Sequence, residues 1–455
     1  MADTTRAANF SFERDQLAAL AAAALAHARA KGASDAEVEV SEGNGMTVTA
    51  RMGEVENIEH NRDKGINVTV YLGRRKGYAS TSDFSAGAVE ATVAAALDIA
   101  RYTAEDACAG LADEDLLARD PADPALLYPW EIDVPAAIEL ARAVEAAAFA
   151  VSPMVRNSEG ASVSAQHSQF IYANSRGFCG GYPTSRHYVS CSVIAAKSAR
   201  AKNAMQRDDW YVSSRDAADI PAGARIGEYA ARRALARLGA RRISTRQCAV
   251  LFEAPLALGL VGSLVSAASG GSLYRKTSFL VDALGTRIFA PHVRISEDPA
   301  VPKGLASGPF DDEGVAARAR DVVRAGVLEG YFLSSYSARK LGMRSTGNAG
   351  GCHNMRLHPT GGDDFEAMLA RLGTGLLVTD LMGHGINYVT GDYSRGAAGY
   401  WVEGGEIAYP VEEITIAGNL KDMYRGVVCA GADLVTRGSM TAGSVLIDRM
   451  TVAGA

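Results

Sequence analysis

The sequence predicts an α+β protein, with antiparallel-sheet-plus-helix units toward its N-terminus and a strand-rich domain toward its C-terminus. Apolar and polar residues alternate in residues 36–82 and again in 161–197, which is the period of half-buried strands. Alanine-rich stretches at 12–31 and 136–150 have the composition and flanking residues of helices. Beyond residue 241, short apolar runs alternate with glycine-rich turns, as in hairpins.

The length of the chain and the order of these patterns predict its domains. A chain of 455 residues is long enough for two or three domains that each bury a core. We expect residues 1–240 to form an N-terminal α+β region made of two units, at about 1–103 and 130–240. Residues 241–455 then form the strand-rich C-terminal domain. The acidic, proline-bearing segment 104–135 predicts a linker or a surface crossover.

The first unit is predicted to be a meander with helices beside it. A helix is expected from Phe12 to about Lys31, with Ser11 as its N-cap. The turns of the meander are expected at 43–45, 62–65 and 74–77, where glycines occur. A second helix follows residue 85, a serine that caps it, and its apolar face carries Val89, Val93, Ala96, Leu97 and Ala100.

The second unit ends in a predicted helix at 225–238 with a basic face. Such a face can bind phosphate, but a solvated face at the C-terminal half of a helix is the more common arrangement and is our expectation. The basic residues are Arg232, Arg233, Arg237, Arg241 and Arg242.

The C-terminal domain is predicted to begin with a strand at 247–253 and an apolar helix from Pro255 to the Gly270-Gly271 pair. Two further helices are expected at 315–327 and 365–372. The remainder predicts hairpins. The clearest lies in 391–420, where Gly404-Gly405 and Gly418-Asn419 are the expected turns.

The composition argues against several classes of function. A net charge of −6 lacks the basic surplus that binding to a nucleic-acid backbone requires. The first 31 residues do not have the order of a secretory signal, and no apolar run reaches the roughly 20 residues of a membrane span. We therefore expect a cytoplasmic protein with neither a membrane nor a nucleic-acid partner.

Sequence motifs for common cofactors are also missing. The six cysteines contain no C-x-x-C pair, so reduced, structural thiols are expected. Neither a phosphate-binding G-x-x-x-x-G-K-[ST] loop nor a complete G-x-S-x-G nucleophile elbow occurs. The sequence therefore predicts no cofactor.

Three segments carry a family resemblance. They are FDDEGV at 310–315, GVLEGYFLSSYSARKLGMRSTGNAGG at 326–351 and GDYSRGAAGYWVEGGEIAYPVEEITIAGNL at 391–420. In this order they resemble the motifs of the TldD/PmbA family of cytosolic peptidase-complex proteins. The resemblance implies two homologous subunits, one zinc-bearing and one not, that form a dimer.

The resemblance also implies where zinc would be held. Zinc-bearing members carry H-E-x-x-x-H on a helix before a segment that corresponds to 275–279 here, which places Gly262, Ser263 and Ala267 at the histidine, glutamate and histidine positions. None of these can bind zinc or abstract a proton. The family's C-terminal cysteine ligand is also missing from 434–443. We therefore expect no catalytic residue and no metal in this chain, which resembles the PmbA/TldE-type subunit.

A metal site of another kind is the alternative. The densest group of candidate ligands is His353 and His358 with Cys352, Asp363 and Asp364. The residues between the two histidines are strand-like, and in a strand positions i and i+5 point to opposite faces. Roles in turns and in the core are therefore favoured over a metal site.

Two polar segments are the candidate contact surfaces. Asp392, Tyr393, Ser394 and Arg395 lie among glycines, which let a foreign backbone approach, and an exposed strand edge there would pair with an extended peptide. The alternative, which we weigh about evenly, is that the glycines only satisfy turns and that Arg395 pairs with Asp392.

The second candidate surface is the acidic segment that begins at Asp311 and Asp312. These acids are expected to cap a helix starting at Val315, with a contact to a partner subunit as the other expectation.

These observations predict the non-zinc partner subunit of a cytosolic heterodimeric metalloprotease complex that processes or degrades small unfolded peptides. The expected partner is a TldD-like zinc metallopeptidase subunit. Two alternatives stay open: an autonomous metallopeptidase with an unrecognised site around His353 and His358, and a homodimeric peptide-binding module. The composition does not explain the family's association with DNA gyrase.

Overall fold

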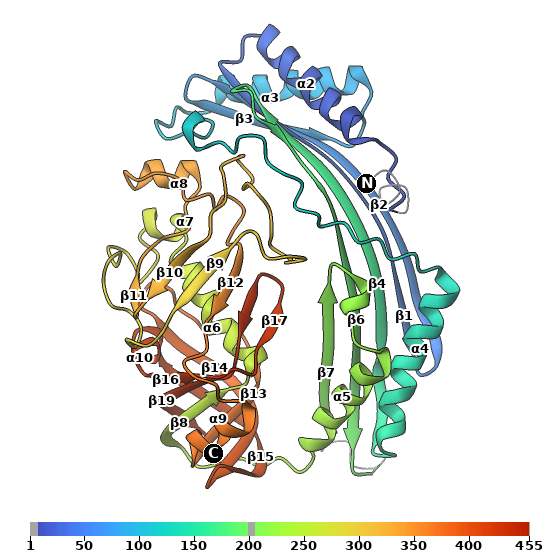
Figure 1. Cartoon of the computed structure of the whole chain (residues 1–455), viewed down its shortest axis with the longest axis vertical. Coiled ribbons are helices and arrows are strands. Elements are labelled where there is room, and N and C mark those ends of the chain that lie inside the picture. Colours follow the sequence, from blue (N-terminus) through green and yellow to red (C-terminus); the bar gives the residue numbers. More distant parts are fainter. Residues whose placement is uncertain (1–7, 199–204, 455) are drawn as a thin grey trace.

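The computed structural model describes residues 8–198 and 205–454. A long, curved N-terminal sheet arches over a C-terminal part that faces its concave side (Figure 1). Helices and sheets whose strand pairs are mostly antiparallel occur in both parts, which confirms the α+β class. None of the helices in these two ranges is long and apolar enough to cross a membrane.

The N-terminal sheet has the strand order β3-β2-β1-β4-β6-β7, with β5 beside β4, and all of its pairs are antiparallel. Strand β1 pairs with β4 from Glu37–Asn174 to Ala50–Ala161, so both predicted N-terminal units contribute to one sheet. The predicted domain boundaries themselves stay a prediction. The strands are β1 (Asp35–Arg51), β2 (Glu54–Leu72), β3 (Arg75–Thr81), β4 (Val155–Asn174), β5 (Cys179–Gly180), β6 (Pro183–Ala196) and β7 (Met205–Ser214).

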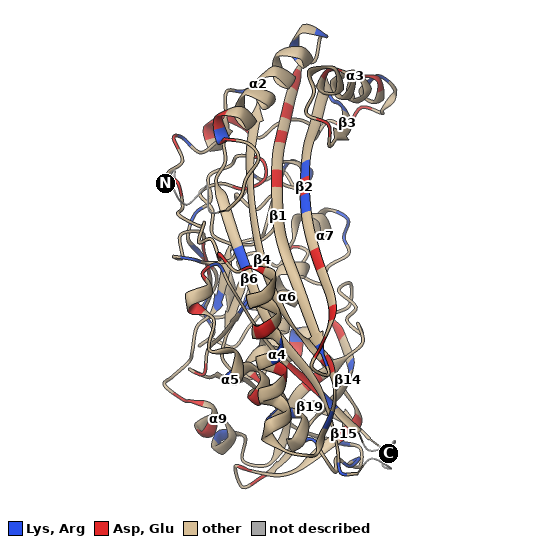
Figure 2. Cartoon of the chain, turned by 90° about the vertical axis from the view of Figure 1, so that its right-hand side faces the viewer, with Lys and Arg blue, Asp and Glu red and all other residues tan. Residues whose placement is uncertain are grey.

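The predicted turns at 43–45 and 62–65 were wrong, because β1 and β2 are single long strands that run most of the length of the molecule (Figure 2). The chain instead reverses at Met52 and Gly53, which have φ of 54° and 79°. Gly45 serves a close approach: a Cβ there would lie 1.9 Å from Oε1 of Gln166 on β4. A glycine inside a strand was thus mistaken for a turn.

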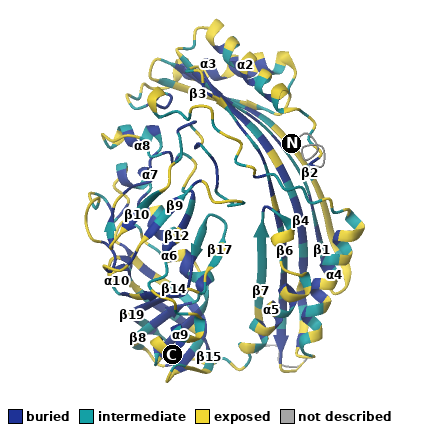
Figure 3. Ribbon diagram, in the orientation of Figure 1, coloured by how far each residue is buried: buried dark blue, intermediate teal, exposed yellow. Residues whose placement is uncertain are grey.

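Four helices cover one face of this sheet, and each buries small apolar residues against it (Figure 3). The side chain of Ser85 accepts the backbone N–H of Ala88, so the predicted cap is confirmed. The first helix is capped by Glu13 in a capping box with Gln16, and the predicted Ser11 cap was wrong. The helices are α2 (Arg14–Ala30), α3 (Ala86–Tyr102), α4 (Val134–Val151) and α5 (Gly223–Ala236).

The C-terminal part contains two sheets. One has the order β11-β10-β9-β12-β18-β17, and the other has the order β15-β14-β13-β8-β19-β16 and closes on itself because β15 also pairs with β19. Their strands are β8 (Arg246–Phe252), β9 (Ile295–Asp298), β10 (Arg320–Arg324), β11 (Val327–Leu328), β12 (Asn354–Leu357), β13 (Gly375–Met382), β14 (Asp392–Glu403), β15 (Glu406–Asn419), β16 (Val427–Ala430), β17 (Val435–Arg437), β18 (Met440–Ala442) and β19 (Val445–Ala453).

The helices and turns of the C-terminal part agree with some of the sequence predictions and differ from others. The prediction of α9 is confirmed, and Gly404 and Gly405 turn the β14–β15 hairpin with φ of 61° and 84°. Gly270 starts α7 rather than stopping α6, and Asn419 caps α10 instead of turning a hairpin. The helices are α6 (Ala254–Ala267), α7 (Gly270–Tyr274), α8 (Ser335–Lys340), α9 (Phe365–Leu372) and α10 (Leu420–Arg425).

The predicted helix at 315–327 was wrong. Residues 320–324 form β10, which pairs with β9 and β11, and Gly326 turns the chain with φ of 76°. The adjacent Val322 and Val323 are both buried inside the C-terminal part. Spacing compatible with a helix was therefore a coincidence within a short strand, which long-range pairing determines.

Ion pairs join the N-terminal region and the C-terminal part at two junctions, one near α8 and one near α5. At the upper one, Arg339 and Lys340 of α8 bind Asp113 and Asp106 at 3.1 and 2.9 Å. At the lower one, the α5 residue Arg233 binds Glu253 at 2.6 Å, and its neighbour Arg237 binds Asp380 at 3.0 Å. The expectation of a solvated basic face was therefore wrong for these two arginines.

The contact between α4 and α5 gives a test of the packing. A Cβ on Gly227 would lie 2.0 Å from the carbonyl oxygen of Val144, and backbone cannot move aside cheaply. We expect Gly227→Ala to lower the free energy of unfolding by about 2–3 kcal/mol, measured as a lower apparent melting temperature. Gly259→Ala is the matched control, since a Cβ on that helical glycine meets nothing within 4 Å. Equal melting of both variants would contradict the close helix contact.

Candidate functional site

The three positions where the resemblance places a zinc motif lie on α6. The hydroxyl of Ser263 is buried and donates to the carbonyl of Gly259 at 2.7 Å, and Ala267 is fully buried. A Cβ on Gly262 would face the Met440 side chain at 3.5 Å. Gly262 has only a hydrogen as its side chain, the hydroxyl of Ser263 is already hydrogen-bonded, and Ala267 has a methyl group. None of these groups is a zinc ligand, so the three residues do not fit the metal.

No group of three or more His, Cys, Asp or Glu side chains is arranged to hold a metal within residues 8–198 and 205–454. The predicted cluster around His353 is dispersed. The imidazole of His353 lies between the carbonyls of Gly347 and Ala306, at 2.9 and 3.3 Å. Asp363 binds Arg371, and Asp364 caps α9.

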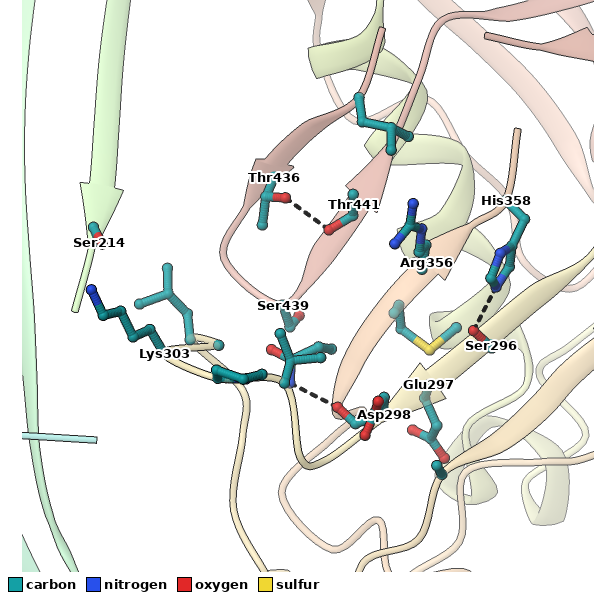
Figure 4. A pocket seen from close by; sticks show the side chains of 18 of the residues that line it. Ser214, Ser296, Glu297, Asp298, Lys303, Arg356, His358, Thr436, Ser439 and Thr441 are labelled. Atoms are coloured by element: carbon teal, nitrogen blue, oxygen red, sulfur yellow. Dashed lines mark hydrogen bonds between the residues drawn. The ribbon is translucent and has the colours of Figure 1, made fainter. Parts of the chain in front are cut away.

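A cavity of about 920 Å³ lies between the two parts. One side of it is formed by the end of β7, at 212–214, and the other by one face of the sheet that contains β9, β12, β18 and β17 (Figure 4). The loop 301–305 forms its rim. Buried Arg215 fixes this loop by donating to the carbonyls of Gly304 and Leu305 at 3.1 and 2.9 Å.

The floor of the cavity is a row of polar side chains that come from five neighbouring strands. The register places Asp321 opposite Ser296 and Ser296 opposite Arg356. Arg356 in turn lies opposite Thr441, and Thr441 opposite Thr436. Directly opposed residues share one face of a sheet, so the pairing brings these five side chains into one line.

Most charges on the cavity wall are paired. Arg294 binds Asp321 at 2.9 Å, and Arg320 binds the buried Glu297 at 2.6 Å. Lys303 of the rim binds Asp219 at 3.0 Å, and it also binds Asp216 beyond the wall. The wall is therefore polar, with little net charge left over.

His358 lies at one end of this wall, and its Nε2 is 2.8 Å from the hydroxyl of Ser296. Burial, followed by the positive charges of Arg294 and Arg356, lowers the pKa of His358 below its ordinary value. The imidazole is therefore neutral at neutral pH. Its ring faces the cavity, whereas His353 is enclosed in loop carbonyls, so the two histidines do not act together.

The candidate segment Asp392–Arg395 lies at the start of β14. Its backbone pairs with β15 on one side, and on the other Ser394 N–H donates to the Gly385 carbonyl at 2.7 Å. This segment is therefore not an open strand edge, and that part of the hypothesis was wrong. Asp392 and Ser394 are exposed, whereas Tyr393 is buried, which raises its pKa to about 12.

The predicted pairing of Arg395 with Asp392 was also wrong. Asp392 accepts from Thr390 and Asn419 at 2.6 and 3.0 Å, and these hydrogen bonds lower its pKa. Arg395 donates to the Leu381 carbonyl at 3.3 Å. A contact of this segment with a peptide or a partner through Asp392 and Ser394 stays a prediction.

The acidic segment at Asp311 does not cap a helix, because none begins at Val315. The carboxylate of Asp311 is buried and accepts the N–H groups of Glu313, Val315 and Ala349 at 2.9–3.0 Å. Glu313 instead accepts the N–H of Ser335 at the start of α8, at 2.7 Å. Asp312 is exposed, and its predicted contact with a partner stays a prediction.

The residues of the cavity floor were not predicted from the sequence. Ser296, Arg356 and Thr441 lie in strands of three or four residues, which are too short to show alternation. They come together through a parallel pairing of β12 with β18, across about 85 residues of chain. No local signal in the sequence carries that information.

Family models match most of the chain. The PmbA/TldA metallopeptidase domain 1 matches residues 36–100, the central domain matches 127–238 and the C-terminal domain matches 245–454. The chain is similar to metalloprotease PmbA of Escherichia coli O157:H7, with 49% identity over 91% of each chain. It is 45% identical to a PmbA homologue of Haemophilus influenzae over 90% of each chain.

Solved structures share the fold. A Bacteroides thetaiotaomicron protein described as a candidate modulator of DNA gyrase matches with a TM-score of 0.91 and 24% identity, over 97% of this chain and 99% of that one. TldE from Thermococcus kodakarensis matches with a TM-score of 0.82 and 18% identity, over 94% and 99%. The resemblance found in the three sequence motifs is thereby confirmed.

The buried carboxyl of Asp311 gives a test by pH. Burial raises its pKa to about 7, above the ordinary value near 4 of an unfolded chain. The folded state then holds the proton more tightly, so the stability from this group is fully present below about pH 4 and is lost as the pH rises to about 7.

Asp311→Asn should lower the free energy of unfolding by about 1–3 kcal/mol, because an amide offers fewer acceptors to the three N–H groups. We expect the advantage of the native chain over the variant to shrink between pH 4 and 7 in denaturant titrations. An advantage that grows over this range would mean that the three N–H groups stabilise the ionised form.

Proposed function

We propose that this chain, which belongs to the PmbA/TldD family of metallopeptidases, is the subunit of a two-subunit peptidase that binds substrate without holding zinc. The single observation that carries the proposal is the chemistry of α6, where Gly262, Ser263 and Ala267 replace the metal ligands and the general base. A homologous zinc-bearing chain supplies the metal and the activated water. The complex acts in the cytoplasm, away from membranes and nucleic acids.

The substrate class is proposed from the cavity. Strand β7 pairs only with β6, and β17 only with β18, among the residues that the structure describes. Residues of both outer strands line the cavity, so backbone groups of two sheet edges border it. An extended, unfolded peptide matches such edges, because main-chain hydrogen bonds bind without regard to sequence.

Arg437 connects these two edges beside the cavity. Its guanidinium lies 4.6 and 4.1 Å from the rings of Trp210 and Tyr211 on β7. Cation–π contacts of this kind hold two elements at a fixed separation without pairing their backbones. The gap between the edges is thus a stable part of the fold, which favours a small peptide over a folded protein as the substrate.

Metal content and cleavage test the proposal together. The chain is purified alone, and also mixed with the zinc-motif homologue from the same cell, and each sample is given a short unfolded peptide. We expect the chain alone to hold less than about 0.1 zinc per molecule and to cleave nothing, while the mixture elutes as a complex and cleaves.

Two outcomes would overturn the proposal. Stoichiometric zinc with cleavage by the chain alone, abolished by His353→Ala or His358→Ala, would establish an autonomous metallopeptidase. Peptide binding by a homodimer that neither associates with the zinc-motif homologue nor supports its activity would establish a binding module.

A further inference from the structure

We propose that Arg356, together with the hydroxyls of Thr441 and Ser439, forms a carboxylate-binding subsite on the floor of the cavity between the two parts. The inference rests on the proposed function, since it assigns the occupant as a carboxylate of the bound peptide. It concerns binding alone and requires no chemistry from this chain.

The first argument is the balance of charge. The other cations of the wall, Arg294, Arg320 and Lys303, each lie within 3.0 Å of a carboxylate. Arg356 is exposed to the cavity, and no carboxylate of the described residues lies within ion-pair distance of it. A guanidinium without a partner, in a polar recess, is the group that an anion would neutralise.

The wall's remaining carboxylate does not compete for Arg356. Asp298 lies one row away, opposite Asn354, and its oxygen accepts the N–H of Ala300 at 2.8 Å in its own turn. Asp321 is held by Arg294 and Arg324, both at 2.9 Å. The nearest internal anions are therefore already engaged.

The second argument is the arrangement of hydrogen-bond donors. Thr441 lies directly opposite Arg356 on β18, and its hydroxyl shares a 2.8 Å hydrogen bond with Thr436. Ser439, two residues before it, lines the same cavity, and its hydroxyl has only a 3.7 Å contact with the sulfur of Cys352. In Figure 4 these hydroxyls and the guanidinium border one space. A planar carboxylate can accept from the guanidinium and a hydroxyl at once.

The third argument distinguishes a carboxylate from a phosphate. Asp298, which has no ion-pair partner among the described residues, lies one row from Arg356 on the same floor, so a dianion would face this carboxylate while gaining one unpaired cation. His358 adds no second positive charge, because its pKa is lowered. A monoanion is the better match, and its source in a peptide is the C-terminus or an Asp or Glu side chain. The volume of about 920 Å³ suits a ligand of this size.

The test measures binding of three fluorescent decapeptides by anisotropy, with the chain alone and with its zinc-motif homologue. One peptide lacks Asp and Glu and has a free C-terminus, the second is its C-terminal amide, and the third is the amide with one internal Glu. For the native chain we expect amidation to weaken binding by about tenfold, the scale of one charge-assisted pair. Arg356→Gln should bind the first two peptides equally, and Arg356→Lys should retain part of the difference.

Arg101→Gln is the matched control, because it also removes an exposed positive charge, on α3 and outside the cavity lining. It should discriminate as the native chain does. Since Arg356 is exposed, its substitution should leave the melting temperature unchanged. The third peptide tests the source: binding as tight as that of the free acid shows that the subsite also accepts a side-chain carboxylate, and binding as weak as that of the amide restricts the subsite to the C-terminus.

The failures can be told apart. If the peptides bind but Arg356→Gln changes the affinity for none of them, the subsite is wrong and the proposed function stands. If no peptide binds to the chain or to the complex, both the subsite and the proposed function are overturned.

Discussion

The architecture depends on the anchoring of one loop, residues 310–316, against the N-terminal sheet. Phe310 packs edge-to-face on Phe178 with ring centroids 5.0 Å apart, and Val315 bridges to Leu117 of the crossover segment. Gly314 has a φ of 77°, and a Cβ on it would lie 3.0 Å from the Phe178 ring, so both the backbone conformation and the close approach favour glycine. The loop thereby carries the C-terminal part against the concave side of the sheet.

The same loop explains why the acidic motif occurs in a chain without metal ligands. The carboxyl group of Asp311 accepts three backbone N–H groups from two segments, and that of Glu313 accepts the N–H of Ser335 in the first turn of α8. Arg339 of α8 then donates to the carbonyls of Cys108 and Gly110 in the crossover segment at 3.3 and 3.0 Å. These carboxylates fix the loop and the start of α8 within the C-terminal part, and α8 in turn contacts the crossover segment. The contacts of Asp311 and Glu313 in this motif are therefore structural.

The sequence predicted the features that local patterns determine. The cap and the apolar face of α3 were correct, and so were the helix α9 and the Gly404-Gly405 hairpin turn, because capping and positive φ depend on a few adjacent residues. Gly45 and the segment 315–327 were misassigned, because their conformations depend on partners far along the chain.

The candidate site, too, was predictable only where a local sequence pattern determines it. The loss of zinc ligands at Gly262, Ser263 and Ala267 could be inferred from a motif resemblance, whereas the cavity floor could not. Ser296, Arg356 and Thr441 come from three strands of three or four residues, and only the register of their sheet aligns them. Arg233 and Arg237 were likewise placed in solvent, because a basic helix face does not reveal which carboxylates a second domain brings to it.

A separation of binding from cutting follows from the charge pattern of the cavity. Ion pairs and hydrogen bonds already satisfy most polar groups of its wall, so side chains of a substrate find few partners there. Two strand edges and the guanidinium of Arg356 remain among the described residues of the wall, and under the proposed function they would bind the main chain and a negative charge of the peptide. A subunit built in this way would retain many peptide sequences with similar affinity. The choice of the bond to be cut would then lie with the chain that holds the metal, since little in this wall distinguishes one side chain from another.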